Sequence, residues 1–296
     1  MLALLLCSVL GVRSWGHVAH RIIADIAESR LSPHSLARVT FLLDGSRLRD
    51  VASWADSVGS DWQWTRKLHY VNAKTCTYDD QRDCPHRQCV VSALTDLALE
   101  SRAFACGNMR DADLHSLESL KMLVHLLADT NQPLHVSGRS DGGNAAKVMF
   151  AGRMMRLHQV WDSGLVEQRA RTSNGADQYT RILIETANMT FINSALGPYA
   201  NLESLWTINS SGNSQLFVDW ASESAAIACT EVWTGYDQNT DQDFSRNYYK
   251  DRETLVDSLL LISGVRLAAV LETLFGNCQM TLKRKRGTFH YVDVTV

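Results

Sequence analysis

Apolar residues recur along most of this chain with the period of a helix. In residues 17–31 the apolar positions Val18, Ile22, Ile23 and Ile26 lie three or four residues apart, or side by side on one face. Similar patterns predict helices over 35–44, 90–104, 113–130, 176–192, 215–231 and 245–275. Pro133 and Gly276 follow two of these segments, where helices commonly stop.

One short segment has a different pattern. Residues 147–150 and 154–157 flank Ala151-Gly152-Arg153, which is typical of a β-hairpin. A further helix would then carry His158 and Asp162. We find no internal repeat and no Pro/Ser-rich linker. The sequence therefore predicts a mainly all-α fold, with a single helical domain over 15–282 and a small β-hairpin.

The N-terminus resembles a signal peptide. An apolar run of about eleven residues opens the chain, which is too short to cross a bilayer as a permanent anchor. Val12 and Ser14 are small residues placed as a signal-peptidase site requires, so we expect residues 1–14 to be removed before Trp15. The alternative is a buried first helix. We expect no transmembrane span, because the most apolar later stretch, 255–271, contains Asp257 and Arg266.

The cysteines fit the same compartment. Of seven cysteines, Cys7 would leave with the signal peptide, and an even number in an oxidising compartment predicts disulfides. A zinc cluster at Cys84-x4-Cys89 with His86 is the alternative. Asn188-Met-Thr and Asn209-Ser-Ser are N-glycosylation acceptors. We therefore place the protein in the secretory pathway, either secreted or in an acidic endolysosomal vesicle.

The charge balance excludes one class of function. The formal net charge is −3, which is not the strongly basic balance of a protein that binds duplex nucleic acid. Lys283-Arg284-Lys285-Arg286 begins a basic C-terminal tail, 283–296, which we expect to be a solvated terminus. A weak phosphate-binding role for this tail is the alternative.

The strongest chemical signal lies between residues 125 and 162. His125-x3-Asp129, His135 and His158-x3-Asp162 fall within 38 residues of apolar surroundings. The i, i+4 spacing puts each His/Asp pair on one helix face. Buried imidazoles and carboxylates are costly unless they are paired or hold a metal, and zinc favours these donors. His20, Asp56 and His69 are further candidates. Taken alone, each histidine would be a core residue with a satisfied hydrogen bond, and each His/Asp pair would be a surface pair that contributes little.

Seven motifs in this region resemble those of the class I nucleases, which are secreted zinc-dependent single-strand-specific nucleases and 3′-nucleotidases. They occur in the family's order over residues 15–162. The motifs are Trp15-Gly16 with His20, Ser53-Trp54-Ala55-Asp56, Leu68-His69-Tyr70-Val71-Asn72, His125-x3-Asp129, Gln132-Pro133-Leu134-His135, Asp141-x-Gly143-Asn144 and Leu157-His158-x2-Trp161-Asp162. The fold implied is that shared by zinc phospholipase C and class I nucleases.

The resemblance implies three zinc ions. One would be held by Asp56, His69, His125 and Asp129, and a second by His135, His158 and Asp162. The third would be held by His20, a shared Asp129, and the free amine and carbonyl of Trp15. Cleavage before Trp15 would therefore complete the site. The ions would outweigh the three aspartates, so the centre would attract phosphate within an acidic protein.

The expected reaction is in-line hydrolysis of single-stranded RNA or DNA to 5′-phosphorylated products, and of 3′-mononucleotides to nucleosides and phosphate. Asp56 and Asp129 would be catalytic, with Asp56 orienting the attacking water. Tyr70 would stack on a base, or else be a core aromatic, and Asn72 would bond a base edge. Asn144 and Arg156 are further candidate substrate contacts.

Three residues depart from the family pattern. Gly59 stands where many relatives carry a basic residue, and Arg156 replaces an asparagine and would supply positive charge. Ala19 replaces a glycine before His20. The family's disulfide pattern implies the pairs Cys76–Cys229 and Cys84–Cys89. We also expect Cys106–Cys278, a pair for which the family pattern gives no support.

Two other functions remain open on the sequence. A zinc phospholipase C would use a similar site, although such enzymes usually carry glutamate where Asp162 stands. A catalytically inactive zinc-binding relative is the other alternative. We expect a monomer.

Overall fold

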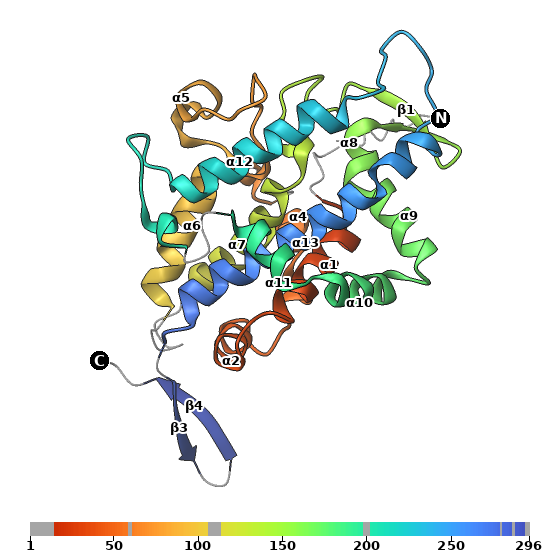
Figure 1. The fold of residues 1–296 in the computed structure, drawn as a ribbon. Coiled ribbons are helices and arrows are strands. Elements are labelled where there is room, and N and C mark those ends of the chain that lie inside the picture. Colours follow the sequence, from red (N-terminus) through yellow and green to blue (C-terminus); the bar gives the residue numbers. More distant parts are fainter. Residues whose placement is uncertain are drawn as a thin grey trace, which may run out of the picture.

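The computed structural model describes residues 15–58, 61–105, 114–197, 202–278, 280–285 and 288–293. The expected signal peptide (1–14), Gly59 and Cys106 lie outside these ranges. The described chain is mainly helical, with many helices arranged around one long central helix (Figure 1). The predicted fold class is therefore confirmed.

Two helices form the centre of the fold. Helix α1 (His17–Glu28) packs along α13 (Asn247–Phe275), where Gly264 allows a close approach. A Cβ at Gly264 would lie 2.4 Å from Cγ2 of Ile26, so a larger residue would push the helices apart. By length and composition α13 could cross a membrane, but 67% of its most apolar window is buried inside the fold. It is a core helix.

The remaining helices surround this pair. They are α2 (Pro33–Leu42), α3 (Leu48–Val51), α4 (Trp54–Val58), α5 (Asp80–Asp83), α6 (Val90–Phe104), α7 (Leu114–Thr130), α8 (Leu157–Gln159), α9 (Leu165–Thr172), α10 (Ala176–Thr186), α11 (Met189–Leu196) and α12 (Gln215–Ile227). The 3₁₀ helices are η1 (Gln63–His69), η2 (Pro85–Arg87), η3 (Pro133–Val136) and η6 (Glu203–Trp206), and π-helical turns form η4 (Val160–Gly164) and η7 (Ala228–Val232).

Most predicted helices are present, but the single helix expected over 176–192 is wrong. The chain leaves α10 at Thr186, and Asn188 begins α11 as its N-cap. The Asn188 side chain accepts a 2.9 Å hydrogen bond from the backbone N–H of Phe191. This capping bond favours a new helix over continuation of the old one. The helix expected over 215–231 ends earlier, at Ile227, and passes into η7.

The predicted hairpin lies next to the candidate site. Strand β1 (Lys147–Phe150) pairs antiparallel with β2 (Arg153–Arg156), so the second strand begins one residue earlier than expected. Ala151 and Gly152 form the turn with positive φ values of 50° and 74°. Such values match the primed turns that fit the twist of a hairpin.

The C-terminal segment differs from our expectation of a tail without regular structure. Strands β3 (Met280–Lys285) and β4 (Thr288–Asp293) pair antiparallel as a second hairpin. This hairpin projects from the helical body (Figure 1). Backbone pairing between the strands, which composition alone did not indicate, accounts for the difference.

One disulfide connects distant parts of the chain, and another closes a short loop. Cys76 is bonded to Cys229, 153 residues away, and Cys84 is bonded to Cys89. The second bond excludes the alternative zinc cluster at these two residues. Cys278 is also disulfide-bonded, whereas its expected partner Cys106 lies outside the described residues.

Candidate metal centre

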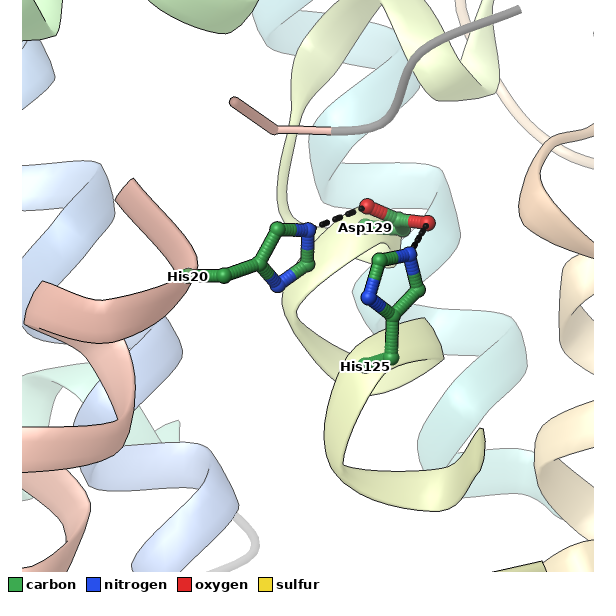
Figure 2. Close-up of side chains that lie close together, drawn as sticks. All are labelled: His20, His125 and Asp129. Carbon is green, nitrogen blue, oxygen red and sulfur yellow. Dashed lines mark ion pairs between the residues drawn. The ribbon is translucent and has the colours of Figure 1, made fainter. Parts of the chain in front are cut away.

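The candidate site is built around Asp129, a carboxylate at the C-terminal end of α7 with no exposed surface. Its two oxygen atoms face different histidines (Figure 2). Oδ1 lies 3.3 Å from Nε2 of His20, and Oδ2 lies 3.2 Å from Nε2 of His125 and 3.1 Å from Nδ1 of His69. These residues lie on three separate elements, α1, η1 and α7, and the fold brings them together.

The first cluster consists of Asp56, His69, His125 and Asp129. Nε2 of His125 lies 3.1 Å from Nδ1 of His69 and 3.7 Å from Oδ1 of Asp56. Ligands of a tetrahedral zinc ion with bonds of 2.0–2.2 Å lie about 3.3–3.6 Å from one another. The spacing of these donors is therefore close to that of a zinc site. The Asp56 side chain is 33% exposed, so this cluster is open to solvent on one side.

The second cluster, where the resemblance implies the third of the three ions, lies on the other side of Asp129. His20 comes from α1 and stacks on His125, with ring centroids 4.0 Å apart and planes 12° from parallel. His20, His125 and Asp129 together could hold a metal ion. Trp15 is fully buried, and the backbone N–H of the next residue, Gly16, donates to the carbonyl oxygen of Asp162.

The third cluster is formed by His135, His158 and Asp162, all buried. The two oxygen atoms of Asp162 lie 3.6 Å from Nε2 of His135 and 3.2 Å from Nε2 of His158. We expected His158 and Asp162 on one helix. They do lie on one continuous helical run, but the run is not a regular α-helix: α8 carries His158, and Asp162 lies in the π-helical turn η4 that follows it. Such turns are frequent at functional sites.

Backbone carbonyls fix which ring nitrogen faces each cluster. Nδ1 of His125 donates to Ala52 O at 2.7 Å, and Nδ1 of His135 donates to His69 O at 2.7 Å. Likewise, Nδ1 of His158 donates to Gly142 O at 2.6 Å. Hydrogen bonds of this kind orient the other nitrogen, Nε2, as the metal-binding atom.

Gln132 positions the acid of the third cluster. Its side-chain amide donates to Oδ1 of Asp162 at 2.6 Å, and its Oε1 accepts the backbone N–H of Leu134 at 2.5 Å. The sequence analysis included Gln132 only as part of a motif. The signal for this supporting role was a polar residue placed in the sequence between two metal-ligand candidates, Asp129 and His135.

Burial and mutual charge shift the pKa values of these groups in opposite directions. Burial, and then the neighbouring His125, lower the pKa of His20 to about 4. Burial would also lower the pKa of His125, but the carboxylates of Asp129 and Asp56 outweigh it and raise the value to about 9. For Asp162, burial raises the pKa well above its usual range. Strongly perturbed groups clustered in this way are typical of a functional site.

The expected base-binding residues lie on an extended segment beside the clusters. Val71 is buried and donates its N–H to His135 O at 2.8 Å, while Tyr70 is half-buried and Asn72 is exposed. Asn72 lines a cleft of about 950 Å³ together with Lys74 and Arg139. The segment that follows His69 therefore borders an open cleft with two cations and one acid, Asp141, in its lining.

The other two expected substrate contacts, Asn144 and Arg156, lie on a loop and at a strand end. The Asn144 amide donates to Asp141 O at 2.9 Å and closes the loop that carries Gly142. Arg156 ends β2 and directly precedes α8, which carries His158. Direct contact of either residue with substrate remains a prediction.

Comparisons with known proteins agree with this geometry. A family model of S1/P1 nuclease matches residues 15–276. Endonuclease 4 of Arabidopsis thaliana is 30% identical over 280 residues, covering 90% of this chain and 91% of that protein. Nuclease S1 of Aspergillus oryzae is 28% identical over 276 residues (87% and 91%), and nuclease P1 of Penicillium citrinum is 27% identical over 281 residues (89% and 98%). The chain therefore belongs to the S1/P1 nuclease family.

Proposed function

We propose that this protein is a zinc-dependent phosphodiesterase. It hydrolyses single-stranded RNA and DNA to 5′-phosphorylated products, and 3′-mononucleotides to nucleosides and phosphate. The observation that carries the proposal is the buried Asp129 carboxylate, whose two oxygens face His20 on one side and His69 and His125 on the other. Family membership supports the same reaction class.

The donors fit zinc. They are imidazole nitrogens and carboxylate oxygens, which zinc prefers. Nε2 of His135 is buried and has no hydrogen-bond partner among the described residues, as expected of an atom that binds a metal. Three ions would be held by the first cluster, by the third cluster, and by His20 with Asp129 and the amine and carbonyl of Trp15.

Bound zinc would supply positive charge for the phosphate and would make water acidic enough to act as a nucleophile near neutral pH. The protein holds the reacting groups in place. Asp129 fixes the separation of two clusters, and the carbonyl-bonded histidines cannot rotate away from them. Asp56, which is partly exposed, orients the attacking water. Fixed, preorganised charge of this kind lowers the barrier to phosphoryl chemistry.

The substrate would lie over the exposed side of the first cluster. Tyr70 stacks on a base and Asn72 bonds its edge, which requires a base free of its duplex partner. Arg156 adds positive charge near His158. These contacts account for a preference for single strands without sequence specificity.

Processing and location follow from the same site. Removal of residues 1–14 would create the Trp15 amine that the second cluster requires. The disulfides and the sequons at Asn188 and Asn209 support passage through the secretory pathway, to the outside or to an acidic vesicle. We propose that the protein acts as a monomer.

The test is metal analysis combined with activity assays on protein whose N-terminus has been sequenced. We expect three zinc ions per chain and release of nucleotides from single-stranded RNA or DNA. Phosphate release from 3′-AMP should be lost with chelator and restored by zinc. Hydrolysis of phosphatidylcholine instead would favour the phospholipase alternative, and zinc binding without either activity would indicate an inactive relative.

A further inference from the structure

Three tryptophans form a row that leads from the core to the surface. We call Trp54, Trp62 and Trp64 the tryptophan ladder. Trp54 packs against the core, and Trp62 meets it edge to face with ring centroids 5.5 Å apart. The ring of Trp64 is nearly parallel to that of Trp62, at 21°, with centroids 6.3 Å apart. Each ring thus supports the next.

The outer ring has an unusual exposure. Trp64 is 68% exposed and is the only aromatic residue among the large, exposed hydrophobic side chains of the described chain. An indole that served only to cover the core would be buried by it, as Trp54 partly is. Tryptophan is enriched at binding interfaces, and the exposed Trp64 continues the aromatic face of Trp62.

Cationic side chains accompany the ladder. Lys67 lies three residues after Trp64 in the 3₁₀ helix η1, where side chains at i and i+3 share one face. The ammonium group of Lys121 lies 5.1 Å from the centre of the Trp54 ring. Arg66 is a further cation on η1, and Asp61 and the partly exposed Asp56 are acids of the same segment, 54–69. The ladder therefore has cations on both η1 and α7, although the whole chain is acidic.

The ladder is continuous with the metal centre. Trp54 and Asp56 belong to the same short helix, α4, and η1 ends at His69. Lys121 precedes His125 by one turn of α7. A chain bound at the centre would therefore meet the ladder next.

We propose that Trp62 and Trp64 form a second stacking site, which binds a base of the same single-stranded nucleic acid some nucleotides away from the cleaved bond. This inference rests on the proposed function of the centre. Aromatic rings flanked by cations suit this ligand, because each base presents a π-face and each link a phosphate. A lipid surface would need a broader apolar area than the one indole that stands exposed here.

The test compares a long substrate with a short one. In the zinc-loaded protein, Trp64→Ala and the double variant Trp62→Ala/Trp64→Ala should raise the KM for a 12-nucleotide single strand by about 5-fold or more. The kcat for that strand and both constants for 3′-AMP should stay within about 2-fold, because a mononucleotide cannot reach the ladder. Trp64→Phe should restore most of the affinity. Lys67→Gln should reduce the salt dependence of strand binding by about 0.7 in log–log slope.

Met189→Ala is the matched control, because Met189 is also 68% exposed and lies on α11, away from this segment. Equal increases in KM for the 12-nucleotide strand and for 3′-AMP would overturn the inference. An unchanged KM for the strand in the double variant would overturn it as well. Trp64-dependent sedimentation with phosphatidylserine vesicles, at unchanged strand KM, would overturn it in favour of a lipid ligand.

Binding measured without hydrolysis separates this inference from the proposed function. Anisotropy of a labelled phosphorothioate strand reports affinity for the zinc-loaded protein even where no cleavage occurs. Loss of strand affinity in the Trp62→Ala/Trp64→Ala variant supports the second stacking site, whether or not the protein cleaves nucleic acid. A wild-type protein that neither cleaves RNA or DNA nor releases phosphate from 3′-AMP contradicts only the function.

Discussion

Gly16 and Asp162 are joined backbone to backbone: the N–H of Gly16 donates to the carbonyl oxygen of Asp162 at 2.7 Å. The contact leaves no room for a side chain. A Cβ at Gly16 would lie 2.3 Å from Oγ of Ser163 and 2.9 Å from the Asp162 carbonyl oxygen. Trp15, where we expect the mature chain to begin, is thereby held beside the third cluster.

We predict that Gly16→Ala lowers the zinc content by about one ion per chain and reduces activity strongly, because the new methyl group displaces Trp15. One residue added before Trp15 should have the same effect, since it removes the free amine. For both variants, elemental analysis of the purified protein measures the zinc content, and the rate of phosphate release from 3′-AMP measures the activity. The same residue added after Val296 is the control. Full zinc in the extended protein would contradict the role of the amine.

Asp129→Asn should remove more metal than any other single ligand change, because this carboxylate faces two clusters. We expect loss of about two zinc ions and a fall in activity of at least about 10³-fold. His158→Ala should remove about one zinc ion, because it changes only the third cluster. Asp177→Asn, at a largely exposed acid, is the control. An Asp129→Asn protein with three zinc ions and full activity would rule out the shared ligand.

Gln132→Ala should weaken zinc binding in the third cluster by about 10–100-fold without removing a ligand. Asp162 would lose the amide that holds its Oδ1 atom. Competition with a zinc chelator measures the affinity. Gln178→Ala provides the comparison, because this half-buried glutamine of α10 accepts a hydrogen bond from Arg181 rather than from a metal-ligand candidate. An unchanged affinity would mean that burial alone orients Asp162.

Zinc binding to the chelator-treated protein should release at least one proton at pH 7. In that form the pKa of His125 is about 9, because Asp129 and Asp56 outweigh its burial. His125 is therefore charged at pH 7 and must become neutral to bind metal. Apparent zinc affinity should then rise as the pH approaches 9. Calorimetry in two buffers of different ionisation enthalpy measures the protons, and identical heats would refute the prediction.

The two sequons should differ in glycan occupancy. Asn188 is exposed, and its capping bond uses the side-chain oxygen. The side-chain nitrogen of Asn209, to which a glycan would attach, instead donates to Asp80 at 2.7 Å. We expect a glycan on Asn188 and little on Asn209, measured by mass spectrometry of glycopeptides. Asn188→Gln should remove most of the glycan mass, and higher occupancy at Asn209 would contradict this.

The sequence was most informative where long helices carry the site. The apolar period of 90–104 matches α6 at both ends, and the i, i+4 spacing of His125 and Asp129 places them on one face of α7. Periodicity could not find α4 or η1, which are too short to show a period, yet they carry Asp56 and His69. Their place in the centre came from the family resemblance.

Two other features lie beyond what the pattern of residues can show. Apolar positions resume directly after Asn188, at Met189, Phe191 and Ile192, so the break between α10 and α11 depends on a capping bond rather than on hydrophobic spacing. The partners that orient His125, His135 and His158 are backbone carbonyls, which any residue could supply. Only the fold reveals them.

The C-terminal hairpin has a practical consequence for anyone who produces this protein. Strands β3 and β4 extend away from the helical body in Figure 1, at the opposite end of the chain from the buried Trp15. An affinity tag or fusion partner attached at the C-terminus should leave the enzyme competent. The same tag left uncleaved at the N-terminus should yield a well-folded but inactive preparation, which an assay of expression or thermal stability alone would not reveal.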